Sequence, residues 1–161
     1  MDAYQTIDPR PVDILMPHLH GVRRFAEPCA GEGRLVAALV ERGLTCCYGG
    51  DIITGQNALH MSRSDCGYPD AVITNPPWTR EILHPLIAHL MGIAPTWLLF
   101  DADWMHNTNG VAPLIRHCSH IVSVGRVRWV EDSNKRGKDN AAWYRFNDQH
   151  VDGPKFIPRK R

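Results

Sequence analysis

Four consecutive residues, Asn75-Pro76-Pro77-Trp78, combine hydrogen-bond acceptors with a flat aromatic face. The two prolines lack an N–H donor and fix their own φ angles, so the polar groups of this loop are mainly acceptors. The side-chain carbonyl of Asn75 and the backbone carbonyl of Pro76 could converge on an NH2 group, and Trp78 offers a face on which a base could stack. The tetrapeptide therefore predicts a loop that positions an amine. The alternative interpretation is a proline turn beside a core tryptophan.

An earlier loop, at the end of the segment from Phe25 to Gly33, is rich in glycine and joins a predicted strand to a predicted helix. Glycines let a ligand approach the backbone closely, and the N-terminus of a helix offers unpaired N–H groups. Asp51 follows the next predicted strand, where an acid could accept hydrogen bonds from ribose hydroxyls. The dinucleotide fingerprint GxGxxG is absent, and Glu27 and Glu32 would repel a pyrophosphate. A ligand with a positive centre and no phosphate, such as S-adenosylmethionine, fits this loop better, and a purely structural turn is the alternative.

The two loops together resemble those of the DNA amino-methyltransferases, which carry a D/N/S-P-P-Y/F/W motif. Residues 75–78 match that motif, and residues 27–33 resemble the cofactor loop of the same family. The resemblance implies S-adenosyl-L-methionine as cofactor and adenine in DNA as substrate, methylated on its exocyclic amino group. It also implies that residues 75–78 form the catalytic loop and that Trp78 stabilises a base flipped out of the duplex.

The resemblance covers nearly the whole chain and implies further contacts to the cofactor. Residues 4–6 resemble the segment that packs over the methionine end, and Asp51-Ile52 resembles the ribose-binding acid and its apolar neighbour. Residues 55–59 resemble the adenine-binding loop, although Asn57 replaces the usual Asp. The implied cofactor-binding residues are Tyr4, Thr6, Glu27, Pro28, Ala30, Gly31, Gly33, Asp51, Ile52, Asn57, Ala58 and Asn75.

Several alternatives remain open. The same chemistry could act on cytosine N4, on adenine in RNA or on a protein glutamine amide, and a methyltransferase-like fold could also serve as an inactive binding module. Release-factor glutamine methyltransferases also use Asn-Pro-Pro, but the Glu27-Pro28 start of the cofactor loop favours the nucleic-acid branch. Pro28-Cys29 resembles the nucleophilic Pro-Cys of cytosine carbon-5 methyltransferases, yet it lies in the cofactor loop. We therefore expect Cys29 to be a packing residue.

The elements that must position these loops alternate between short apolar runs and helical stretches, which predicts an α/β domain. We expect a Rossmann-like class I methyltransferase fold, in which a mostly parallel twisted sheet ends in a C-terminal antiparallel hairpin and carries helices on both faces. The predicted strands are residues 25–28, 45–48, 71–74, 96–100, 121–130 and 141–146. The predicted helices are residues 10–19, 34–42, 81–91 and 111–117, the second of them stopped by Gly43.

The net charge of +1 is unevenly distributed along the chain. Residues 1–120 contain 8 basic and 12 acidic side chains, a net charge of −4, whereas residues 121–161 contain 10 and 5, a net charge of +5. The basic tail, residues 158–161, suits a polyanionic partner, or else it only aids solubility. Lys135, Arg136 and Lys138 are candidate phosphate contacts, or else a solvated hairpin loop.

The length of 161 residues fits one catalytic domain and leaves no room for a separate target-recognition domain. We therefore expect relaxed specificity, a short recognition sequence or a partner protein that supplies specificity. No apolar run reaches the ~20 residues that span a bilayer, and no signal peptide is visible, so we predict a cytoplasmic protein that does not bind membranes. The five cysteines include no CxxC pair, and we predict no metal site.

Overall fold

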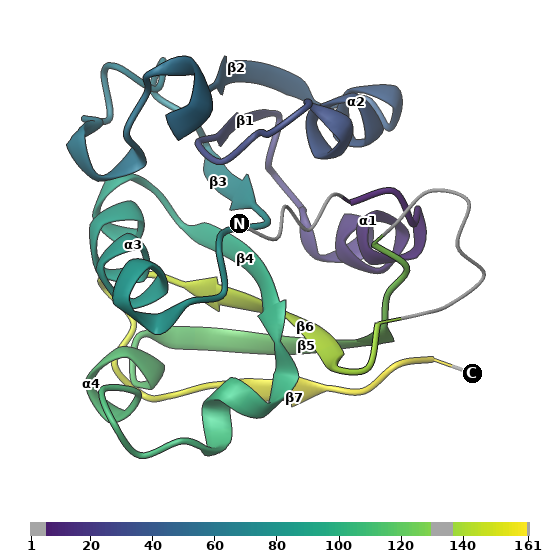
Figure 1. Cartoon of the computed structure of the whole chain (residues 1–161), viewed down its shortest axis with the longest axis vertical. Helices are drawn as coiled ribbons and strands as arrows, with labels where there is room; N and C mark the ends of the chain where they lie inside the picture. Colours follow the sequence, from purple (N-terminus) through teal and green to yellow (C-terminus); the bar gives the residue numbers. More distant parts are fainter. Residues whose placement is uncertain (1–5, 130–136, 161) are drawn as a thin grey trace.

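The computed structural model describes residues 6–129 and 137–160, and these form a single seven-stranded sheet. The order of the strands across the sheet is β2-β1-β3-β4-β6-β5-β7 (Figure 1). The strands are β1 (Arg24–Glu27), β2 (Thr45–Gly49), β3 (Ala71–Thr74), β4 (Thr96–Asp101), β5 (Cys118–Arg126), β6 (Asn140–Phe146) and β7 (Lys155–Ile157).

The first four strands are parallel, and the C-terminal strands change direction. Strand β6 is antiparallel to both β4 and β5, which confirms the predicted hairpin, and β7 pairs in parallel with β5. All six predicted strands are present. The prediction omitted β7, a three-residue strand between Pro154 and Pro158. Prolines are confined to the ends and edges of sheets because they cannot donate to the ladder, and β7 is indeed an edge strand.

Helices occupy the connections between the strands. They are α1 (Arg10–Leu15), α2 (Arg34–Glu41), α3 (Arg80–Ile93) and α4 (Ala112–Ile115), with short 3-10 turns η1 (Met16–His18), η2 (Ile52–Thr54), η3 (Ala58–His60) and η4 (Ala102–His106). The first helix was predicted to continue to Leu19, but its α-helical part ends at Leu15. Pro17 is the physical reason, because a proline ring clashes with the carbonyl four residues earlier. Gly43 ends the second helix in the left-handed conformation that was predicted, with φ of 95°.

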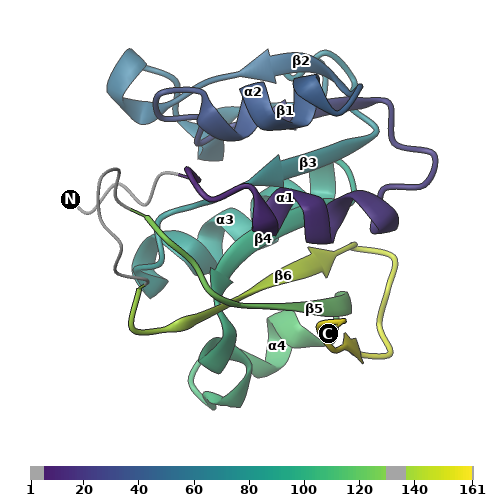
Figure 2. The ribbon, with the colours of Figure 1, turned by 90° about the vertical axis from the view of Figure 1, so that its right-hand side faces the viewer.

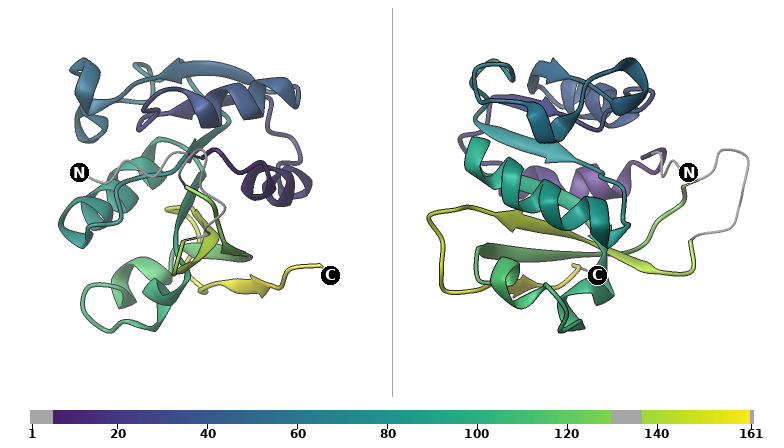
Figure 3. Two further views of the ribbon diagram at one scale, coloured as in Figure 1. Left: turned by 45° about the vertical axis from the view of Figure 1, so that its right-hand side comes forward. Right: turned by 60° about the vertical axis from the view of Figure 1, so that its left-hand side comes forward.

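Helices cover both faces of the sheet, as predicted. Helix α3 lies on one face, whereas α1 and α2 lie on the other (Figures 2 and 3). Successive side chains of a strand point to opposite faces, so Leu98 packs in the α3-side core and Leu99 in the α1-side core. In β6, Tyr144 likewise packs in the α3-side core and Trp143 in the α1-side core. Burial on both sides explains why these strands are continuously apolar in sequence.

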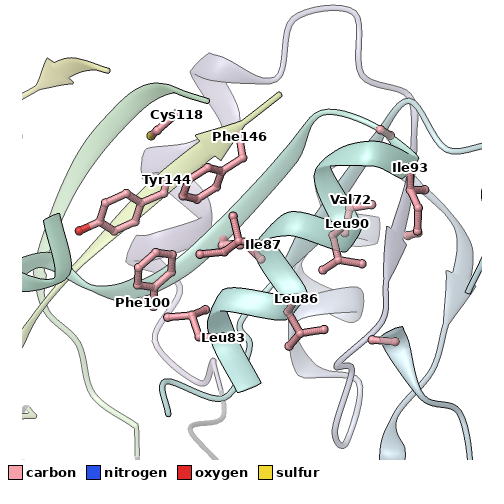
Figure 4. Packing of buried hydrophobic residues seen from close by; sticks show 14 of the residues in the cluster. Val72, Leu83, Leu86, Ile87, Leu90, Ile93, Phe100, Cys118, Tyr144 and Phe146 are labelled. Atoms are coloured by element: carbon pink, nitrogen blue, oxygen red, sulfur yellow. The ribbon is translucent and has the colours of Figure 1, made fainter. Parts of the chain in front are cut away.

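The core on the α3 side is built from aliphatic residues of the helix and aromatic residues of the sheet. Leu83, Ile87 and Leu90 are at most 1% exposed. In Figure 4, Leu83 lies near Phe100, Ile87 near Phe146 and Leu90 near Val72. None of the described helices has the length and apolar character needed to cross a membrane.

Replacing the buried side chain of Leu90 by alanine should destabilise the protein substantially. Leu90 is fully buried, and Leu→Ala changes at such sites cost about 2–5 kcal/mol. Ile82→Ala is the matched control on the same helix, since Ile82 is 43% exposed and should lose less than about 1 kcal/mol. Urea unfolding of both variants measures the difference, and equal losses would contradict the assigned orientation of α3.

Candidate functional site

The loop between β1 and α2 is a tight turn that depends on two glycines. Gly31 and Gly33 have φ of 52° and 80°, in the left-handed region that favours glycine. The amide of Gly33 donates to the carbonyl of Ala30 at 2.7 Å, and the amide of Ala30 donates to the carbonyl of Gly50 at 2.8 Å. The turn is therefore closed on itself and attached to the segment that follows β2.

Asp51 connects this turn to the end of β2. One carboxylate oxygen accepts a hydrogen bond from the amide of Gly31 at 2.9 Å, and the other accepts one from the amide of Ile53 at 2.9 Å. Each carboxylate oxygen can accept more than one hydrogen bond, so both retain capacity for ribose hydroxyls. Asp51 thus occupies the predicted place at the carboxyl end of β2.

The predicted adenine-binding residues lie in the two 3-10 turns after Asp51. Ile52 is 59% exposed and its neighbour Ile53 is 79% exposed, so both apolar side chains reach the surface beside Asp51. The side-chain oxygen of Asn57 accepts from the amide of Leu59 at 3.0 Å and caps η3, and Ala58 behind it is buried. An Asp could make the same cap, so the local fold tolerates the departure of Asn57 from the family pattern.

Glu27 is a buried carboxyl between the two predicted loops. It is 1% exposed, and its side chain accepts from the amide of Cys29 at 2.9 Å. Burial raises its pKa to about 8; contacts with the Thr74 hydroxyl and with the amides of Cys29 and Asn75 oppose this rise, and the charge of Asp51 adds to it. The carboxyl therefore links the end of β1 to the end of β3, and a cation bound nearby would favour its ionised form.

Asn75 meets the N-terminal segment of the chain. Its side-chain NH2 donates to the hydroxyl of Thr6 at 3.3 Å, although the two residues are 69 positions apart. Thr6 and Asp8 are both buried. The carboxylate of Asp8 binds the guanidinium of Arg10 and also accepts from the amide of Arg128 at 3.3 Å. These bonds attach the segment to the chain that leaves β5.

Arg10 completes this attachment. Its guanidinium donates to the carbonyl of Arg126 at 2.8 Å. Burial opposes the ionisation of Asp8, but the hydrogen bonds from Arg10 and Arg128 outweigh burial and lower the pKa of the carboxyl. Neither Asp8 nor Arg10 was among the predicted site residues, because their role depends on a long-range contact and not on a local motif.

Trp78 is half-buried and packs against both cores. Its ring makes an edge-to-face contact with Trp129, with centroids 5.6 Å apart and planes at 88°. Pro76 is buried and Pro77 is exposed. Trp78 thus agrees in part with each interpretation of the sequence. Its ring packs against the core, as a core tryptophan would, and it also reaches the surface, where a base could stack. Trp129 was not predicted, and the only signal was an aromatic residue at the end of a long strand.

Of the three predicted phosphate contacts, one lies among the described residues. Lys138 is exposed just before β6. Tyr4, Lys135 and Arg136 lie outside the described residues.

Cys29 is partly buried and packs against the α3-side core. Burial raises the pKa of its thiol to about 12, and the charges of Glu27 and Asp51 add to this effect. A thiol with so high a pKa is a poor nucleophile, which agrees with the expected packing role. Among the described residues, no three His, Cys, Asp or Glu side chains are grouped to hold a metal ion.

The chain is similar to known proteins in its structure but not in its sequence. No protein-family model matches the chain, and no curated protein is similar in sequence. A protein from Pyrococcus horikoshii described as a candidate RNA methyltransferase has a TM-score of 0.60 and 15% identity, over 86% of this chain and 82% of that one. A candidate class I S-adenosylmethionine-dependent methyltransferase from Listeria monocytogenes has a TM-score of 0.61 and 13% identity, over 96% and 64%.

The M protein of the type I restriction enzyme EcoKI is also similar, with a TM-score of 0.55 and 12% identity. The match covers 97% of this chain, which spans only 49% of that protein. These likenesses confirm the predicted class I methyltransferase fold. At such low identity they show the fold alone.

The buried position of Glu27 should make stability depend on pH. Its carboxyl has an ordinary pKa of 4.5 and a pKa of about 8 in the folded protein. Between these values the folded chain holds a proton that the unfolded chain has lost, so stability falls as pH rises, by about 1.4 kcal/mol per unit. Glu27→Gln cannot ionise, and its stability relative to the parent should therefore rise steadily from pH 5 to pH 8.

Urea unfolding across this pH range measures the effect. Glu41→Gln is the matched control, because the side chain of Glu41 is 82% exposed and its removal should leave the pH profile unchanged. A constant difference between Glu27→Gln and the parent at every pH would show that Glu27 ionises normally in the fold.

Proposed function

We propose that this protein is an S-adenosylmethionine-dependent methyltransferase that methylates the exocyclic amino group of adenine in DNA. The observation that carries the proposal is the meeting of the glycine turn and the Asn75 loop at one edge of the sheet. Glu27, at the end of β1, contacts the amide of Asn75, at the end of β3. A cofactor loop and an amine-binding loop must be neighbours for group transfer between their ligands.

The residues of the first loop suit this cofactor. The cofactor would supply an electrophilic methyl group on a sulfonium centre. Gly31 and Gly33 leave room for close approach to the backbone, Asp51 would accept from the ribose, and the exposed Ile52 would cover the adenine ring. Glu27 and Asp51 place carboxyl groups where a cationic ligand is favoured and a phosphate is not.

The residues of the second loop suit an amino group as acceptor of the methyl. The lone pair of an adenine amino group is delocalised into the ring, so the nitrogen is a poor nucleophile. Acceptors at Asn75 and Pro76 would draw both N–H hydrogens to one side and make the lone pair available on the other. Such catalysis rests on positioning and electrostatics, with no covalent enzyme intermediate.

The choice of adenine in DNA is the finer part of the proposal. It is supported by the Glu27-Pro28 start of the cofactor loop, by the excess of basic residues after position 120, and by the likeness to a restriction-modification M protein. Another structural neighbour is described as a candidate RNA methyltransferase, so the experiment must distinguish adenine in RNA from adenine in DNA. We further propose that residues 1–161 act as one catalytic domain, with specificity supplied by a short site or by a partner protein.

Incubating the protein with tritiated cofactor and DNA of mixed sequence should label N6-methyladenine, identified by nucleoside analysis. RNA and a glutamine-containing protein mixture are incubated in parallel. Label confined to RNA, protein or N4-methylcytosine would overturn the assignment to DNA adenine, and no transfer to any of them would favour an inactive module.

Asn75→Ala should lower kcat by on the order of 10²–10³-fold, the typical loss when one preorganised polar group at a reacting centre is removed. Cofactor affinity should fall far less than kcat, because Asn75 is only one of the twelve implied cofactor-binding residues. Asn75→Asp is the matched variant, because the family motif accepts Asp and the carboxylate retains an acceptor. Full activity of Asn75→Ala would contradict the proposed role of its amide as an acceptor for the substrate amino group.

Asp51→Ala should weaken binding of S-adenosylmethionine by about 2 kcal/mol, or roughly 30-fold, since it removes hydrogen bonds to a charged acceptor. Calorimetry measures this affinity without requiring catalysis. Asp152→Ala removes an exposed carboxylate elsewhere and should bind as the parent does. If the parent itself bound no cofactor, the whole proposal would fail.

A further inference from the structure

A group of basic side chains lies on the α1 side of the C-terminal strands. Strand β7 pairs with β5 so that Lys155 is beside His120 and Ile157 is beside Val122. Val122 belongs to the α1-side core, and Ile157 packs against it. Because alternate residues of a strand share a face, Lys155 and His120 lie on the α1 side as well.

The charges around His120 all have the same sign. Burial lowers the pKa of its imidazole, and Arg145, His18, Lys155 and His150 lower it further. No carboxylate of the described residues is among the groups that act on it. Uncompensated positive charge at one place on a surface creates a potential that attracts anions.

His18 extends this group towards the end of the first helix. Burial lowers the pKa of His18, and His20 and Lys160 lower it further. In Figure 1, α1 and the C-terminal end of the chain lie on the same side of the sheet, opposite α3 and α4. Residues 158–160 therefore lie on the α1 side, where they add to the charge of β5 and β6.

The tail extends the charge from one end of β5 to the other. The guanidinium of Arg159 covers Gly125, so closely that a Cβ atom on this glycine would lie 2.5 Å from Nη1. Gly125 has φ of 86° and lies at an irregularity of the strand, where only glycine lets the guanidinium approach. Lys155 therefore lies beside the amino half of β5, and the guanidinium of Arg159 lies at its carboxyl end.

The carboxyl end of β5 belongs to the edge of the sheet that carries the candidate site. Gly125 pairs with Ala141, and Ala141 pairs with Asp101 at the end of β4. The chain then continues to Trp129, which contacts Trp78. From His120 to Gly125 the strand rises by roughly 17 Å, which equals the axial rise of about five base-pair steps of DNA.

We propose that Lys155 and Arg159, supported by His18, His120 and Arg145, bind the phosphate backbone of the nucleic acid whose base is presented at Trp78. We call these five residues the β5 strip. The inference rests on the proposed function for the identity of the nucleic acid as DNA. A nucleic acid fits better than an anionic membrane because the strip is linear and leads to the aromatic pair at the candidate site.

The test measures binding of a short fluorescent DNA duplex by anisotropy over about 50–200 mM salt. Lys155→Gln/Arg159→Gln removes two exposed charges and should reduce the slope of log Kd against log salt by about 1.8, since each phosphate contact contributes about 0.9. KM for DNA should rise, while kcat and the cofactor Kd stay at parental values. Arg23→Gln/Arg63→Gln is the matched control, with the same change in net charge at two exposed positions near β1 and β3. Melting temperatures verify that both variants fold.

Each outcome decides the question. An unchanged salt slope in Lys155→Gln/Arg159→Gln, or an equal reduction in the control, would contradict the proposal that the β5 strip binds phosphates. If Lys155→Gln/Arg159→Gln lost binding to phosphatidylserine vesicles but kept DNA binding, the surface would be assigned to a membrane instead. An absence of DNA binding by the parent protein would also refute the proposal. A reduced slope in a protein that methylates no DNA would uphold the strip and refute the proposed function.

Discussion

Strand β1 lies between β2 and β3, and this order brings the carboxyl ends of three strands to one edge of the sheet. The loops that follow them are otherwise far apart in the chain. A position where neighbouring strands connect to opposite sides is the usual place for a ligand in an open α/β sheet. The glycine turn, Asp51 and Asn75 meet there because the hydrophobic cores on both faces hold the three strands in this register.

Burial of Glu27 couples the two halves of the candidate site electrostatically. A carboxyl taken out of water is costly in its ionised form, and the amides of Cys29 and Asn75 only partly compensate. A bound cation would restore the ionised form, so cofactor binding near neutral pH would release a proton. A phosphate at this place would meet the carboxylate of Asp51 and would oppose the ionisation of Glu27 still further, which explains why this glycine-rich turn does not favour a dinucleotide.

The sequence predicted those features that depend on local periodicity. The run from Ala71 to Thr74 has three apolar residues and a β-branched threonine before a polar loop, and the strand was predicted with the bounds that the structure has. Strand β7 was missed because three residues between prolines carry no periodicity, and its pairing with β5 is a tertiary contact. The hydrogen bond of Asn75 to Thr6 was also beyond local patterns, although the N-terminal segment had been assigned to this region by resemblance. Trp129 was missed for the same reason, since only the fold brings it to Trp78.

The N-terminal segment shows how residues outside the motif determine the geometry inside it. Asp8 is bound by Arg10 and by the amide of Arg128, so the segment is fixed at the end of β5 and Thr6 is held at Asn75. A side-chain amide is planar, so the hydrogen bond from its nitrogen to Thr6 also restricts where the oxygen of Asn75 can lie. The orientation of this single amide therefore depends on a chain of bonds that extends across the sheet to Arg126. In the proposed methyltransferase, a misplacement of about 1 Å at Asn75 would cost on the order of 10²-fold in rate.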